Sequence, residues 1–518
     1  MLIPVGGAAV DMVTTHSFSV TASPTAIALE HLLVVGKYVG ELALLSPELA
    51  SRIQFGWAIS IHIVFAALSV GLAPFLVYFV FQEIRTGRKR YARLRIFWTK
   101  VFALGFIMGT VTGIPMSFMF GTNWAAFSTA AGEMIGGPLS FETKMAFFLE
   151  AVFLGVLLFG RERVSDRFYA LSAVLVAVGA WLSAFWIIVV NSWMQTPRGY
   201  EMIVENGLPI ARLTDPAAAF LNPRLPWMYF HMQGSAVLAV TLLIAGIASY
   251  FVWRNHTGEK SFNRESEVWK TALRVAVVVL LVTAMFQAVQ GDLYGRHVSD
   301  TQPMKFAAME AHYDTGPADL HVVAIPTDLE AITDPRADNL FTISIPYLAS
   351  FLASGGDPFA EVTGINDFDY EPPPVAWVFW AFRVMVGLGF WFLLLGLWGT
   401  YRLWRGGLFE DDRYLKALML SSPLGFVALI AGWYVAEIGR QPWLIQDELT
   451  TAEGVSPTLG STEATITLVG FVIGYVLLFG VFLYVFRRIV EDEAERVRTD
   501  DVSDSHETPD IPEVTVDD

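Results

Sequence analysis

The chain contains no cysteine in 518 residues. This absence excludes structural disulfides, thiolate metal ligands, iron–sulfur clusters held by cysteine, and covalently attached haem. Charged residues are also scarce, at 16% of the sequence, whereas hydrophobic residues make up 54%. This composition, with a mean hydropathy of +0.49, is not that of an ordinary soluble protein.

Long apolar stretches recur along the chain, and each can cross the hydrocarbon of a bilayer, which takes about 20 residues. We expect nine membrane-spanning helices, near residues 53–81, 97–120, 141–160, 168–190, 227–253, 270–290, 375–400, 415–437 and 465–487. Lipid requires backbone groups to be satisfied within each segment. The predicted fold class is therefore all-α, a single polytopic membrane helix bundle.

The two ends of the chain differ from this apolar body. Residues 1–50 lack a basic start and a cleavage pattern, so we predict an amino-terminal extension rather than a signal peptide. Its stretch AIALEHLLVVGKYVGELALL could form an interfacial helix. The tail 491–518 is acidic and almost free of large apolar groups, which predicts disorder. The formal charge of -16 argues against nucleic acid as a partner and suggests a salt-rich habitat.

Short basic loops alternate with loops that are poor in lysine and arginine. The basic segments follow the first, third, fifth and seventh expected spans and close the ninth. Because positive residues in short loops stay in the cytoplasm, we expect the amino terminus outside and the carboxyl terminus in the cytoplasm. In this orientation His62, Glu150, His231, Met385 and Glu437 all lie in the outer half of the membrane.

The end of the eighth span, AGWYVAEIGRQPW from Ala431 to Trp443, places ionisable residues at the membrane edge. Trp433, Glu437 and Arg440 are four and three residues apart, so they would share one face of a helix. Ionisable residues at bilayer depth are costly and indicate a functional site. The alternative is a pair of interfacial anchors, the tryptophan and the arginine, beside a satisfied glutamate.

Of nine histidines, only His62 and His231 lie within expected spans. A single intramembrane histidine often does no more than bond two helices together. Two of them, with a buried Met385 and several carboxylates, favour haem, since imidazole and thioether are both axial iron ligands. Two are too few for a haem–copper oxygen reductase. No span carries the paired histidines of a bis-histidine quinol–cytochrome c reductase.

A proton-coupled transporter remains an alternative at this point. Glu142, Glu150 and Arg383 could form an intramembrane relay. The spans nevertheless lack the matching glycine- or proline-interrupted pair that inverted repeats would require.

Seven motifs together resemble one family, subunit I of the cytochrome bd-type quinol oxidases. The resemblance runs from about Arg52 to Trp443, and its motifs occur in the family's order: SRIQFGWAISIH, GTNWAAF, FETKMAFFLEA, NSWMQTP, the span opening with WMYFH, FRVMVG and GRQPW. It implies six helices in 51–290, an external quinol-binding loop in 291–374 and three helices in 375–490.

The resemblance implies ligands for three haems. His231 and Met385 match the axial pair of a low-spin haem b. His62 and Glu437 match ligand positions of a two-haem active centre, which would hold a high-spin haem b and either haem d or a further haem b. Which of those two haems each residue binds stays open.

Other matched positions surround these ligands. Arg440 resembles a counter-charge to a haem propionate, and Trp433 an aromatic packed between the haems. Arg383 would point away from the face that carries Met385, because the two are roughly 200° apart on a helix, and could reach a propionate at the edge.

The third and fourth expected spans match a proton route. Glu142 and Glu150 match acidic positions associated with proton delivery, about two turns apart and roughly 80° around an α-helix. Ser183 and Asn191 match polar positions of the same route, although Ser183 could simply bond back to its own helix. Lys144 is a departure from the family pattern and could pair with a carboxylate or a propionate.

The outer loop resembles the shorter type of quinol-binding loop. Its segment DTQPMKFAAMEAHYD predicts a short helix with Pro303 in the first turn. Gln302, Lys305 and Glu310 match positions linked to quinol oxidation. Lys305 and Glu310 are five residues apart and so would not be neighbours on one face; the alternative is a solvated amphipathic turn.

The resemblance implies a terminal oxidase of the cell membrane. Quinol would be oxidised at the outer face and dioxygen reduced to water with cytoplasmic protons, which generates a proton motive force without pumping. A subunit II, and small accessory subunits, would be partners. The alternatives are a haem b electron-transfer subunit without oxygen chemistry and the transporter already considered.

Overall fold

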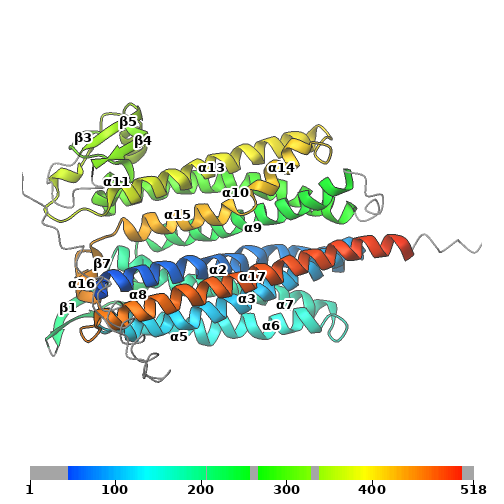
Figure 1. Cartoon of the computed structure of the whole chain (residues 1–518), viewed down its shortest axis with the longest axis horizontal. Helices are drawn as coiled ribbons and strands as arrows, with labels where there is room; N and C mark the ends of the chain where they lie inside the picture. The colour runs from blue at the N-terminus through cyan, green and yellow to red at the C-terminus, as the bar shows by residue number, and fades with distance from the viewer. Residues whose placement is uncertain (1–44, 206, 257–265, 328–337, 504–518) are drawn as a thin grey trace, which may run out of the picture.

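The computed structural model describes residues 45–503 except 206, 257–265 and 328–337. The long helices run side by side along the molecule, and the short strands gather at one end, with the carboxyl end of α17 at the other (Figure 1). The predicted interfacial helix of the extension lies outside the described residues. The all-α prediction is confirmed.

The helices and strands follow one another in two halves around an irregular segment. The first half contains α2 Pro47–Thr86, α3 Lys89–Thr122, α4 Ala125–Ala130, α5 Gly132–Phe141, the π-helix η1 Glu142–Ala146, α6 Phe147–Phe159, α7 Asp166–Gln195, β1 Tyr200–Glu205, β2 Leu208–Leu213, α8 Pro216–Phe220, α9 Leu225–His256 and α10 Ser266–Thr301. The segment that follows contains α11 Pro303–Glu310, β3 Gly316–Pro317, β4 Leu320–Pro326, β5 Asn339–Ile345, α12 Leu348–Ser354, β6 Glu361–Val362 and the 3-10 helix η4 Ile365–Asp367. The second half contains α13 Val375–Trp404, α14 Asp412–Ser421, α15 Leu424–Ile438, β7 Trp443–Ile445, β8 Leu449–Thr450, α16 Thr451–Gly454 and α17 Ser461–Ser503.

Eight helices in the described part of the chain are long and apolar enough to cross a membrane. The expected span at 141–160 differs, because its helical run is divided into α5, η1 and α6. In a π turn the bonded residues are five rather than four positions apart, so the α-helix is interrupted and no single α-helix there reaches spanning length. The eight helices of spanning length indicate a multi-pass membrane protein.

Two rings of four helices form the body of the molecule. In one, α2, α3, α6 and α7 contact each other in turn; in the other, α9, α10, α13 and α15 do so. Contacts of α2 with α9 join the rings, and α17 packs outside the first ring against α2 and α3. The short strands pair in four two-stranded sheets, β1 with β2, β3 with β6, β4 with β5 and β7 with β8, all antiparallel.

Local signals explain where the helices begin and end. Before α2, the Ser46 hydroxyl accepts a hydrogen bond from Leu49 N at 3.2 Å, and Pro47 occupies the first turn. Gly87, with φ 64°, ends the helix in the left-handed conformation that favours glycine. α11 begins as predicted, with Pro303 in its first turn.

Two predicted boundaries were wrong. The outer loop begins after Thr301 rather than at residue 291, because α10 continues with an ion pair between Arg296 and Asp292 at 2.5 Å. The acidic tail is helical as far as Ser503 rather than disordered from residue 491. Its charges stabilise that helix, since Glu493 pairs with Arg93 of α3 at 2.9 Å.

The contact between the rings depends on a glycine. A Cβ added to Gly71 of α2 would lie 2.2 Å from the carbonyl oxygen of Ala236 on α9, so the two backbones could not approach as closely with any other residue. Small residues at helix contacts allow this approach in membranes.

We predict that Gly71→Ala destabilises the protein by about 1–3 kcal/mol, because a backbone has to move to accept the methyl group. Gly56→Ala is the matched control on the same helix, since no atom of the described residues lies within 4 Å of its added Cβ. Thermal unfolding in detergent measures both. Equal midpoints for the two variants would contradict the proposed contact.

Candidate active site

His231 of α9 is oriented by the neighbouring helix α10. Its Nδ1 lies 2.6 Å from Gln290 Oε1, while Gln290 Nε2 donates to the carbonyl of Trp227 at 2.6 Å. Because the amide uses its NH2 on Trp227, its oxygen accepts, and Nδ1 must carry the hydrogen. The lone pair of His231 is therefore on Nε2, the arrangement that metal-binding histidines show.

His62 of α2 is oriented in the same way by α3. Its Nδ1 lies 3.0 Å from Thr112 Oγ1, and that hydroxyl donates its own hydrogen to the carbonyl of Met108 at 2.8 Å. The hydroxyl can then only accept from the ring, which leaves Nε2 with the lone pair. A Cβ added to Gly113 would lie 3.0 Å from His62 Cε1, so a glycine gives the ring its space.

Met385 and Arg383 leave α13 toward different neighbours, as their spacing predicts. A Cβ added to Gly432 of α15 would lie 2.8 Å from Met385 Sδ, so the thioether rests against a glycine. Arg383 turns to the outer segment, where Nη2 donates to Glu310 Oε2 at 2.5 Å and Nε donates to the carbonyl of His321 at 2.5 Å. The predicted propionate contact of Arg383 stays a prediction.

Glu437 lies at the end of α15, where the two rings meet. Asn191 Nδ2 and Gln195 Nε2, both of α7, donate to its Oε1 at 2.9 and 3.2 Å. Arg440 pairs with its Oε2 and also donates to the carbonyl of Leu444 at 2.6 Å. α15 ends at Ile438, so Arg440 folds back from the following turn instead of continuing the helix. Half-buried Trp433 lies one turn earlier.

The carboxylates of the third expected span lie between α6 and α7. Ser183 Oγ donates to Glu142 Oε1 at 2.9 Å, so Ser183 does not simply bond to its own helix. Glu150 is 6% exposed, and its Oε1 has no hydrogen-bond partner among the described residues. Asn191 contacts Glu437 instead of these groups. The side chain of Lys144 is exposed, and no ion pair with it occurs in the described part of the chain.

The π-helix η1 changes the geometry expected for this pair of glutamates. Glu142 is its first residue, and the wider turn separates Glu142 from Glu150. The angle of roughly 80° expected for an α-helix therefore does not apply across this segment.

The short helix α11 carries two buried charged residues, Lys305 and Glu310, which have different partners. Lys305 is 2% exposed, and its Nζ donates to Gln195 Oε1 at 2.5 Å and to Gln302 Oε1 at 2.7 Å. Burial, with the guanidinium groups of Arg224 and Arg440 nearby, holds its pKa well below the usual value.

Glu310 lies at the other end of α11 and is 4% exposed. Burial raises the pKa of its carboxyl group, and the ion pair with Arg383 opposes that rise. The alternative of a solvated amphipathic turn is wrong, because Met304 to Glu310 are all buried.

The chain matches the family Cytochrome bd terminal oxidase subunit I over residues 50–494. It belongs to this family. It is 30% identical over 471 residues to the cytochrome bd ubiquinol oxidase subunit 1 of Bacillus subtilis, covering 88% of this chain and 96% of that protein. It is also 30% identical to the cytochrome bd-II ubiquinol oxidase subunit 1 of Escherichia coli, covering 77% and 88%.

A solved structure, that of the bd oxidase from Geobacillus thermodenitrificans, has the same fold. The TM-score is 0.76 at 30% sequence identity, and the match covers 86% of this chain and 99% of that one. The present bd-type subunit I is thus a quinol oxidase subunit, and its family implies haem cofactors and a quinol substrate.

The donor residues of this subunit I fit haem. An imidazole with its lone pair on Nε2 and a thioether are both ligand types that would hold a haem iron. His231 and Met385 come from α9 and α13, opposite members of one helix ring. His62 lies in the other ring, and Glu437 joins the two.

The motifs alone did not single out several residues of this site. Thr112 and Gln290 orient the two histidines, and Gln195 connects Lys305 with Glu437. A sequence signal existed for Gln195, since it lies four residues after Asn191 on the same helix face. None existed for Thr112 and Gln290, because their contacts cross between helices.

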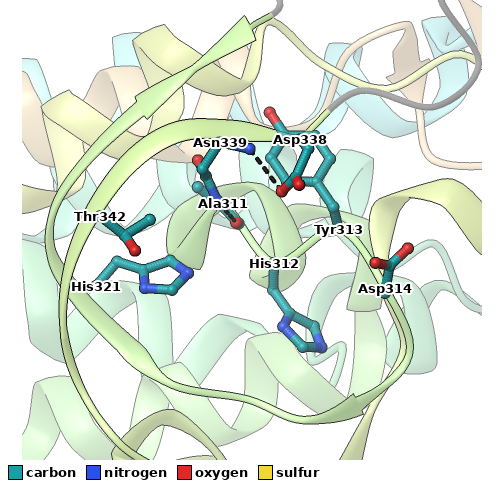
Figure 2. A pocket seen from close by; sticks show the side chains of 8 residues that line it. All are labelled: Ala311, His312, Tyr313, Asp314, His321, Asp338, Asn339 and Thr342. Atoms are coloured by element: carbon teal, nitrogen blue, oxygen red, sulfur yellow. Dashed lines mark hydrogen bonds between the residues drawn. The ribbon is translucent and has the colours of Figure 1, made fainter.

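A cavity in the outer segment was also not predicted. It has a volume of about 360 Å³ and lies between the end of α11 and strands β4 and β5, lined by Ala311, His312, Tyr313, Asp314, His321, Asp338, Asn339 and Thr342. Figure 2 shows Asn339 bonded to the carbonyl of Ala311, at 2.9 Å. Ala311 has φ 50°, an uncommon conformation that turns the chain from Glu310 into this cavity.

If His62 holds a haem, we predict that Thr112→Val lowers the affinity for it about 10–100-fold, the usual effect of losing a partner that orients a ligand. Thr110→Val is the matched control, since among the described residues that hydroxyl bonds to the Phe106 carbonyl of its own helix. Haem content per polypeptide, measured after dialysis against apomyoglobin, compares the variants. The same haem loss in both would contradict the role of Thr112.

Proposed function

We propose that this subunit I oxidises membrane quinol at its outer segment and reduces dioxygen to water at a haem centre near His62 and Glu437. The observation that carries the proposal is the orientation of the two intramembrane histidines. In each, Nδ1 donates to a neighbouring helix and Nε2 keeps the lone pair. Neither a proton carrier nor a helix-to-helix hydrogen bond requires this common arrangement.

The family pattern implies three haems for these donor residues. His231 and Met385 would hold a low-spin haem b, and His62 and Glu437 a pair consisting of a high-spin haem b and a haem d or further haem b. When bound, these groups supply electron transfer and the reduction of oxygen. Arg440 and Asn191 keep Glu437 oriented and charge-balanced, and Trp433 and Arg383 complete the surroundings of the haems.

Quinol oxidation is assigned to α11. Gln302, Lys305 and Glu310 offer an amide, an ammonium and a carboxylate within one short helix at the membrane edge. Glu310 would accept a proton from the quinol hydroxyl, and the ion pair with Arg383 favours its ionised form. The adjoining cavity opens a way for that proton to leave on the outer side.

Protons for water formation would come from the cytoplasm along α6 and α7. Glu150 is buried without a partner for Oε1 among the described residues, which suits a proton carrier on this route. Glu142 and Ser183 form a hydrogen-bonded pair next along the same two helices. Each charge that crosses the membrane corresponds to about 2.3 kcal/mol per 100 mV, so the reaction conserves energy without a pump. A subunit II would cover part of these helices and complete the cytoplasmic entrance.

Oxygen consumption with a short-chain quinol, together with a reduced-minus-oxidised spectrum of the purified complex, tests this function. We expect quinol-dependent oxygen uptake and haem b bands, with a band far to the red if the third haem is haem d. A protein without a Soret band would be a haem-free carrier. One with haem b and no oxygen uptake would be an electron-transfer subunit only.

We predict that His231→Ala and Met385→Leu each remove the low-spin haem signal and leave haem in the active centre. Met285→Leu is the control, because Met285 is 55% exposed on the outside of α10. Optical spectra of the reduced proteins measure the change. An unaltered low-spin spectrum in both ligand variants would end the assignment.

The Arg383–Glu310 pair generates a prediction on pH. Glu310 has to be ionised to accept a proton, burial raises its pKa, and Arg383 opposes that rise. Arg383→Gln removes the opposing charge. The pH at which activity rises to half its maximum should therefore be about one to three units higher than in the wild type. Arg383→Lys keeps a cation and should shift the profile less. An acid limb that stays in place, or moves to lower pH, in Arg383→Gln would refute the role of Glu310.

A further inference from the structure

One buried glutamine connects the quinol-binding helix with the carboxylate at the haem centre. Gln195, the last residue of α7, is fully buried. Its Oε1 accepts a hydrogen bond from Lys305 Nζ at 2.5 Å. Its Nε2 donates to Glu437 Oε1 at 3.2 Å and to the carbonyl of Ala436 at 3.1 Å. A single amide therefore separates the ammonium of α11 from the carboxylate of α15.

The chemistry of the two partners fixes the direction of this amide. A lysine ammonium only donates hydrogen bonds and an ionised glutamate only accepts them. The amide oxygen must therefore face Lys305 and the amide nitrogen must face Glu437. A side chain without both a donor and an acceptor at its end cannot bridge these two groups.

A second contact joins α11 to the turn that follows α15. A Cβ added to Gly439 would lie 2.9 Å from Lys305 Cγ, so the stem of the lysine passes directly over the backbone between Glu437 and Arg440. Lys305 is thus held at its stem by the turn after α15 and at its ammonium by Gln195 and Gln302. A displacement of Lys305 must change the surroundings of Glu437.

We propose that Gln195 is a positioning residue that couples occupancy of the quinol site to the geometry of Glu437. This inference rests on the proposed function. Two hydrogens of Lys305 bond to Gln195 and Gln302, and a quinol or quinone oxygen at α11 competes for them. When Lys305 turns to the ligand, Gln195 loses its partner at Oε1, and its amide is released to shift against Glu437. A quinol or quinone bound at the outer segment thereby changes the hydrogen-bond donors around the Glu437 carboxylate.

The test uses the oxidised holoenzyme with its partner subunit. A short-chain benzoquinone and a short-chain naphthoquinone are titrated in separate experiments, and the absorption band of the high-spin haem is followed. We expect a saturable shift of this band in the wild type with whichever quinone binds. Coupling between two sites is reciprocal, so cyanide at the haem centre should change the affinity for the quinone as well.

Three variants separate coupling from mere structural support. Gln195→Leu removes the bonds to Lys305, Glu437 and Ala436. It should abolish the band shift and lower the KM for quinol by up to about tenfold, because the quinol no longer competes with Gln195 for a hydrogen of Lys305. Gln195→Glu keeps an acceptor for Lys305 but sets a second carboxylate against Glu437. It should leave the KM near the wild-type value and move the haem band even without quinone. Gln54→Leu is the control, since Gln54 is equally buried but bonds to Asn123 and Thr467.

Gln195→Asn replaces Gln195→Leu if the latter does not assemble, because its amide is one methylene too short to reach both partners. Loss of the shift in this variant, with the shift retained in Gln54→Leu, supports the proposal. A wild-type shift that persists in Gln195→Leu or Gln195→Asn overturns it, and so does a wild type that binds quinone without any shift. A wild type that does not oxidise quinol at all would instead refute the proposed function.

Discussion

The arrangement of this site depends on the carboxylate of Glu437 and the donors that hold it. An ionised carboxylate at the membrane edge is stable only if it is paired and hydrogen-bonded. Asn191 and Gln195 supply two amide hydrogens from one helix ring, and Arg440 supplies the counter-charge. The two amide donors come from α7 and the acceptor from α15. The bonds that satisfy Glu437 therefore also fix the two rings relative to each other.

The rings themselves are positioned by close contacts between small residues. In lipid there is no hydrophobic driving force for apolar helices to associate, so their packing depends on the fit of their surfaces. Gly71 against Ala236 and Gly425 against Ala239 bring α2 and α15 close to α9. Gly113 and Gly432 serve a different purpose, since they leave room beside His62 and Met385. Glycines thus set both the distance between the helices and the space around the ligand side chains.

Much of the fold could be predicted from the sequence, because apolar length and basic loops report directly on membrane helices. The candidate ligand residues His62, His231, Met385 and Glu437 could be proposed from the sequence because imidazole and carboxylate groups are rare at bilayer depth. The division of the third span was not predicted, since a π turn at Glu142 leaves no mark in hydropathy. The helical extension of α17 was missed because charge-rich composition was taken as disorder, whereas ion pairs within the helix and with Arg93 stabilise it.

The contacts between helices were the least predictable part of the site. Gln195 meets Lys305 and Glu437, which are 110 and 242 positions away in the sequence. The cavity beside His312 and His321 likewise forms only when β4 and β5 pair next to α11. Such contacts depend on the packing of distant segments, which no local pattern specifies.

The positions of iron in the purified complex test the central claim most directly. Anomalous diffraction at the iron edge should place one iron between His231 Nε2 and Met385 Sδ, and others beside His62 Nε2 and the Glu437 carboxylate. Iron peaks away from these four side chains, or no iron peak within either helix ring, would contradict the account.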